Sequence, residues 1–148
     1  MSGFGRGLSR GFVLCAGLAL LGAAPPAPAD GKVKLAALGA LTPGMWQLRE
    51  LDGDGVPQSL CAADLATLMR TEHRNTSCTT TVISDEPKSA TIHYNCAAGG
   101  FGRTSLRVET SKLAKIDTQG IAGNVPFAHR LLARHVGSCP QARLGSRR

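Results

Sequence analysis

Aromatic side chains are scarce in this sequence of 148 residues, which has one Trp, one Tyr and four Phe. The formal net charge is +7, but the basic residues are not interleaved with aromatics as they are in many nucleic-acid-binding surfaces. No apolar run reaches the ~20 uninterrupted residues that a membrane-spanning helix needs. The composition therefore predicts neither a nucleic-acid partner nor a transmembrane span in the mature chain.

The N-terminus has the pattern of a cleaved secretory signal peptide. Arg6 and Arg10 precede an apolar stretch over residues 11–24, and Ala27-Pro28-Ala29 supplies the small residues of a cleavage site. Cleavage would leave 15 Lys and Arg against 10 Asp and Glu, so the mature chain stays basic. The predicted organisation is a signal peptide over residues 1–29, a lead-in segment over 30–42, one disulfide-stapled β domain over 43–139 and a basic disordered tail over 140–148.

Motifs of catalysis and metal binding are missing from the sequence after residue 30. There is no Gly-x-Ser-x-Gly elbow, and the glycines of residues 99–102 are not followed by the Lys-Ser/Thr of a phosphate-binding loop. No Cys-x-x-Cys pair is present to bind zinc, and the turn over residues 52–55 lacks the distal Glu of a calcium loop. The sequence predicts a protein that is not an enzyme and that holds no cofactor or metal.

Four cysteines remain once Cys15 is removed with the signal peptide: Cys61, Cys78, Cys96 and Cys139. In a small exported chain four cysteines predict two disulfides, with three possible connectivities. Residues 78–96 favour one of them, because two β-branched runs flank a charged turn at Pro87 and read as a hairpin. A fold about Pro87 places Cys78 opposite Cys96, Thr80 opposite Tyr94 and Val82 opposite Ile92, all on one face. This register predicts a Cys78–Cys96 disulfide and leaves Cys61–Cys139 by elimination.

Alternating apolar residues predict further strands over residues 45–51, 56–60, 103–110 and 113–118. An Asp-Gly turn over residues 52–55 would join the first two of these strands. In the segment 61–70, Leu65, Leu68 and Met69 fall at helical spacing and predict a short α-helix. Residues 124–139 fit two patterns: a helix capped by Asn124 and ended by Gly137, or a strand.

The predicted fold class is mainly β, with an antiparallel meander that forms a curved sheet or open barrel, one short α-helix and two disulfides. The side chains expected in its core are Trp46, Leu48, Val82, Ile92, Tyr94, Leu106 and Val108.

Several of these features occur together in one known family. The chain resembles the small exported proteobacterial proteins called domain of unknown function 3617 in four features: Pro43-Gly44-Met45-Trp46, Cys61 before a short helix, the Cys78/Cys96 hairpin and the sequence of residues 133–139. The resemblance covers nearly all of residues 35–139, and residues 103–110 and 116–122 look like the version from sphingomonad-type bacteria. It implies a periplasmic antiparallel β protein whose last strand ends at a cysteine, which favours the strand for residues 127–139. The family offers no catalytic residues to carry over.

The remaining candidates for function are histidines and arginines. On a strand, His129 and His135 share a face but lie six residues apart, too far to chelate one ion without other ligands. Two basic stripes are predicted, one by Arg103 and Arg107 and the other by Arg130 and Arg134. Arginines four residues apart on a strand are about 13 Å apart, so each pair forms a stripe and not a pocket.

If the two stripes are adjacent, they would suit an anionic partner such as a lipid headgroup, a polysaccharide or an acidic envelope protein. The expected function is a non-catalytic binding or interaction module of the cell envelope. Two alternatives stay open: a structural or stress-associated envelope protein without a small ligand, and a hydrolase or metal-binding protein.

Overall fold

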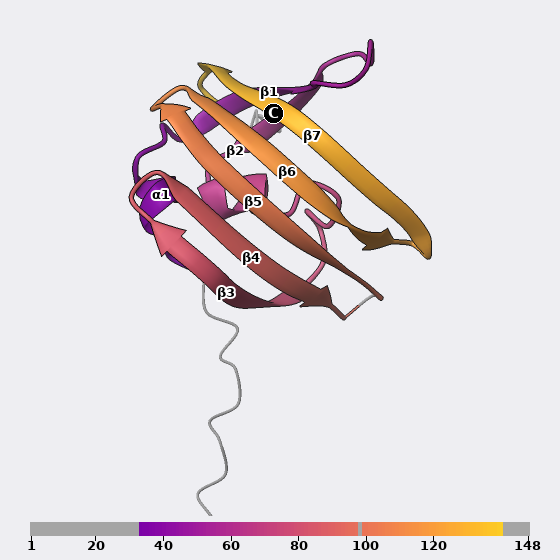
Figure 1. Ribbon diagram of the computed structural model, residues 1–148. Helices are drawn as coiled ribbons and strands as arrows, with labels where there is room; N and C mark the ends of the chain where they lie inside the picture. The colour runs from indigo at the N-terminus through magenta and orange to yellow at the C-terminus, as the bar shows by residue number, and fades with distance from the viewer. Residues whose placement is uncertain (1–32, 98, 141–148) are drawn as a thin grey trace, which may run out of the picture.

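The computed structural model describes residues 33–97 and 99–140, which form one seven-stranded antiparallel sheet (Figure 1). The predicted signal peptide and all but the first residue of the predicted tail lie outside the described residues. A helix α1 precedes the sheet and a 3-10 helix η1 follows the second strand. The elements are α1 (Ala36–Gly39), β1 (Gly44–Glu50), β2 (Gln58–Ala62), η1 (Leu65–Met69), β3 (Cys78–Glu86), β4 (Ser89–Cys96), β5 (Gly100–Thr110), β6 (Leu113–Ala122) and β7 (Val125–Gly137).

The strands are arranged in the order β2-β1-β7-β6-β5-β4-β3. Strands β3 to β7 form a meander of sequential antiparallel pairs, and the β1–β2 hairpin pairs with the free side of β7 through β1. The sheet is not closed, because β2 and β3 are its two edges. This confirms the predicted antiparallel β fold, in the form of one unclosed sheet.

One face of the sheet is covered by α1, η1 and the loop of residues 63–77, as Figure 1 shows. We call this the inner face and the uncovered side the outer face. Trp46 of β1 is fully buried on the inner face, where its indole packs edge-on against His135 and donates a hydrogen bond to the carbonyl of Thr42. The predicted core residues Trp46, Leu48, Ile92, Tyr94, Leu106 and Val108 are all buried.

The three predicted pairs of the β3–β4 hairpin are confirmed, with Cys78 opposite Cys96, Thr80 opposite Tyr94 and Val82 opposite Ile92. Nearer the turn the register shifts by one residue, and Glu86 pairs with Ser89. The prediction that Val82 belongs to the core is wrong, since 45% of the residue is exposed. β3 has a neighbour on one side only, and its pairing shifts between Val82 and Ser84. An edge strand with a bulge turns away from the packed layer, which accounts for the exposure of Val82.

The α-helix predicted over residues 61–70 is present only as the 3-10 helix η1, because Cys61 and Ala62 continue β2 and pair with β1. The side chain of Asp64 caps η1 by accepting a hydrogen bond from the amide of Ala66. Leu68 and Met69 are buried, as the helical spacing predicted. The α-helix of the structure is α1, within the lead-in segment.

The second pattern considered for residues 124–139, a strand, is the one observed. Gly123 and Asn124 both have positive φ angles, 56° and 64°, and form a two-residue turn between β6 and β7. This conformation is typical of tight hairpin turns and leaves Asn124 unable to cap a helix. Both predicted disulfides are formed, Cys78–Cys96 within the hairpin and Cys61–Cys139 between β2 and the segment after β7.

Candidate functional site

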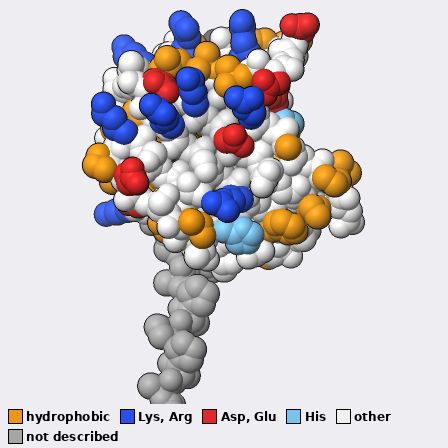
Figure 2. Space-filling view, in the orientation of Figure 1, with side chains coloured by type: hydrophobic (Ala, Val, Ile, Leu, Met, Phe, Trp, Pro, Cys, Tyr) orange, Lys and Arg blue, Asp and Glu red, His pale blue; other side chains and the backbone are white. Residues whose placement is uncertain are grey.

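The four arginines predicted to form two stripes lie together on the outer face. Arg103 and Arg107 belong to β5, Arg130 and Arg134 belong to β7, and β6 separates the two pairs. Their neighbours Leu106, Val108, Leu131 and Ala133 are buried on the inner face, so the arginines point outward. Neighbouring strands are about 4.8 Å apart, which places the stripes about 10 Å from each other. Figure 2 shows Lys and Arg side chains gathered over this face.

Lys115 of β6 joins the two stripes into one basic surface. Its Cα pairs with Arg107 on one side and with Leu132 on the other, and Leu132 pairs in turn with Arg49 of β1. Basic residues directly opposite each other in a sheet repel, and Glu109 offsets this. One carboxylate oxygen of Glu109 lies 3.6 Å from Arg107 Nε and 3.6 Å from Lys115 Nζ.

The arginines of this surface differ in how far their charge is neutralised. Arg130 Nη1 lies 3.2 Å from the Asp52 carboxylate. Arg103 and Arg134 have no ion pair with any residue in the described ranges. We call Arg49, Arg103, Arg107, Lys115, Arg130 and Arg134 the basic face. Since part of its charge has no partner among the described residues, it is available to an external anion.

Two shallow hollows open on the outer face. One, of about 230 Å³, is lined by Arg107, Lys115, Asp117 and Arg130 among others. The second, of about 310 Å³, is lined by His93, Phe101, Arg103 and Gln119 among others, at the opposite end of β5.

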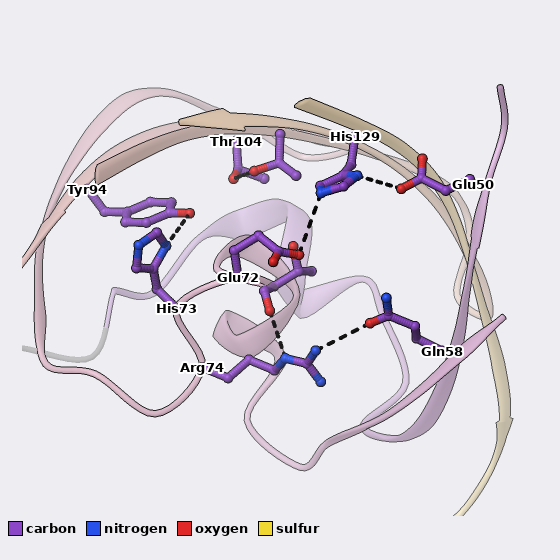
Figure 3. A network of polar contacts seen from close by, with 10 residues as sticks. Glu50, Gln58, Glu72, His73, Arg74, Tyr94, Thr104 and His129 are labelled. Carbon is purple, nitrogen blue, oxygen red and sulfur yellow. Dashed lines mark hydrogen bonds and ion pairs between the residues drawn. The ribbon is translucent and has the colours of Figure 1, made fainter. Parts of the chain in front are cut away.

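A polar cluster that the sequence did not predict lies on the inner face, under the loop of residues 70–77 (Figure 3). His73 Nδ1 of this loop lies 3.3 Å from the Tyr94 hydroxyl, and the hydroxyls of Thr104 and Thr118 are 2.7 Å apart. All four of these residues are buried. The His73–Tyr94 contact fastens the loop to the sheet, and the Thr104–Thr118 hydrogen bond joins β5 to β6 where apolar packing is interrupted.

His129 of β7 carries the second part of the cluster. Its Nδ1 lies 2.6 Å from a Glu50 carboxylate oxygen, and its Nε2 lies 3.9 Å from Glu72 of the loop. Figure 3 shows the imidazole between the two carboxylates. About one-third of each of the three side chains is exposed, so this part of the cluster faces water at the rim of the inner face.

Burial raises the pKa of the Tyr94 phenol above its ordinary value, while the hydroxyls of Thr118 and Thr104 lower it in part. The phenol therefore stays protonated near neutral pH and acts as a hydrogen-bonding group. His73 Nε2 and Thr71 Oγ1 are buried, and neither has a hydrogen-bond partner among the residues that the structure describes. No group of three metal-ligating side chains is assembled within the ranges that the structure describes.

The histidines considered as a possible metal pair are held apart. His129 lies between Glu50 and Glu72, whereas His135 packs against Trp46 and has its Nε2 3.3 Å from the carbonyl of Pro43. The described cysteines are joined in disulfides, so they provide no thiolate. The inner cluster thus ties the loop of residues 70–77, β1 and β7 to one another.

The fold and the site define a disulfide-linked protein built on one open antiparallel sheet, with a basic outer face. No protein-family model, curated protein or solved structure matches the chain. Among the described helices, none combines the length and the apolar character needed to cross a membrane.

Proposed function

We propose that this protein is an exported, non-catalytic binding module of the periplasm and that its basic face binds an anionic partner of the cell envelope. The observation that carries the proposal is the position of Arg103 and Arg107 on the same face as Arg130 and Arg134, with Lys115 between them. Arg103 and Arg134 have no acidic partner among the described residues, so an external anion would not have to displace one.

Export is supported by the signal-peptide pattern of residues 1–29 and by the pairing of the described cysteines, since disulfides persist in oxidising compartments. The resemblance to the domain of unknown function 3617 family points to the same compartment.

Salt elution from an immobilised sulfated polysaccharide tests the basic face directly. The double variant Arg103→Gln/Arg107→Gln is expected to elute at lower salt than the unmodified protein, because surface charge interactions are screened by salt. The matched control is Lys34→Gln/Arg74→Gln, which removes the same charge from two exposed residues outside the basic face. Equal shifts for both variants would show that net charge alone determines retention, and the basic face would lose its role.

A further inference from the structure

The second hollow of the outer face has a composition that the rest of the basic face lacks. We call it the Phe101 hollow; its lining includes His93, Phe101, Arg103, Gln119, Ile121 and Phe127. Its volume of about 310 Å³ lies at the small end of the ~300–1,000 Å³ that is typical of small-molecule sites. Figure 2 shows a histidine and a basic side chain beside hydrophobic side chains on the lower part of this face.

The hollow is built from two neighbouring rows of side chains that cross the strands. In the first row His93, Arg103 and Gln119 are direct Cα partners across β4, β5 and β6. In the second row Phe101 pairs with Ile121, and the Phe101 ring centroid lies 6.1 Å from that of His93. One side of the hollow is therefore polar and planar, and the other is apolar and aromatic.

Phe101 is 43% exposed, because no described element covers the outer face here. An exposed aromatic ring next to planar hydrogen-bonding groups suits a sugar ring. The C–H face of a sugar packs on an aromatic ring, while its hydroxyls bond to amide, imidazole and guanidinium groups. Arg103 adds a charge that has no ion-pair partner in the described part of the chain, and a carboxylate satisfies such a guanidinium through two parallel hydrogen bonds.

We infer that the Phe101 hollow binds a carboxylate-bearing sugar residue of an acidic polysaccharide. The inference rests on the proposed function and names the chemistry of its anionic partner. The aromatic ring beside planar polar groups favours a polysaccharide over a lipid headgroup, because a sugar residue offers a C–H face as well as hydroxyls and a carboxylate. Arg107 lies about 13 Å further along β5, so a chain of several residues that leaves the hollow in that direction reaches a second cation.

The test is calorimetric titration of the full mature protein with three ligands: hexagalacturonate, its methyl-esterified form and the single sugar galacturonate. We expect binding of the hexamer, weaker binding of the monomer, and a loss of at least about tenfold on esterification, because a charge-assisted hydrogen bond is lost. Arg103→Gln should cause a similar loss for the free acid and reduce its advantage over the ester, with the remaining advantage due to Arg107 and the rest of the basic face. Phe101→Ala should weaken binding by about three- to tenfold, the range measured for aromatic contacts.

The matched control is Val136→Ala, which removes an exposed apolar side chain from β7 and should leave binding unchanged. If hexagalacturonate binds equally well to Phe101→Ala, the hollow is not the site and only the general attraction of the basic face remains. If the protein binds phosphatidylglycerol vesicles through Arg103 and Arg107 but not hexagalacturonate, the proposed function stands and the sugar inference falls. If no polyanion binds, both fall.

Discussion

Tyr94→Phe removes one buried oxygen and leaves the aromatic ring in place. The Tyr94 hydroxyl lies 3.3 Å from His73 Nδ1, and His73 Nε2 is already without a partner. The variant would therefore leave both nitrogens of a buried imidazole unpaired. A lost hydrogen bond costs about 1 kcal/mol net, and a buried polar group left unpaired costs about 1–3 kcal/mol. We expect the free energy of unfolding to fall by about 2–3 kcal/mol.

The same substitution should change how stability depends on pH. Burial raises the pKa of Tyr94 in the folded protein, so above pH ~10 the unfolded chain loses the phenolic proton first. The stability linked to the protonated phenol is fully present below that pH and is lost as pH rises through the folded-state pKa. Tyr94→Phe has no phenol, so its stability should lack this alkaline decrease.

The assay is urea unfolding at a series of pH values, followed by the fluorescence of Trp46, the one Trp in the chain. Because Tyr94 is the one Tyr, phenolate absorbance reports its ionisation alone. The Tyr94→Phe curve also serves as the control for every other effect of alkaline pH on stability. The reasoning is refuted if the phenol ionises at its ordinary pKa, or if the variant unfolds at the same urea concentration as the unmodified protein.

Two further predictions concern stability. Replacing Cys61 and Cys139 by Ser opens a loop with a sequence separation of 78 residues and should cost about 4.5 kcal/mol by the chain-entropy relation, against about 3 for the hairpin disulfide with its separation of 18. Equal losses in urea unfolding would contradict this order. Gly102→Ala should lower the melting temperature, because the added Cβ would lie 2.4 Å from the Tyr94 hydroxyl oxygen. Gly39→Ala is the control and should leave the melting temperature unchanged, because the added Cβ has open space around it. A Gly102→Ala variant as stable as Gly39→Ala would disprove the clash.

Local alternation was sufficient to predict the pairs from Cys78–Cys96 to Val82–Ile92, because one register places the apolar side chains and both cysteines on the same face. It could not predict the exposure of Val82, because the period of a strand identifies a face but not whether another layer covers it. The spacing of Leu65, Leu68 and Met69 fits a 3-10 helix as well as an α-helix, and the pairing of Cys61 with β1 shortened the segment.

The basic face could be placed only in part from the sequence. A meander puts β6 between β5 and β7, but the pattern of residues 124–139 left open whether Arg130 and Arg134 lie on a strand at all. The inner cluster draws on Glu50, Glu72 and His129, which are distant in sequence and meet only after the loop of residues 70–77 folds over the sheet. One signal was present: Thr104 occupies an inward position next to Leu106, where an apolar side chain would be expected.

The placement of the disulfides has a consequence for how molecules of this protein behave toward one another. An open sheet has two unpaired borders, and such borders invite strand exchange and aggregation. Here each border strand carries one cysteine: Cys78 binds β3 to β4, and Cys61 binds β2 to the segment that follows β7. Neither border strand can leave its own sheet to join that of another molecule unless a covalent bond is broken. The disulfides therefore oppose exchange of β2 or β3 between molecules, and reduction would remove this restraint from both edge strands.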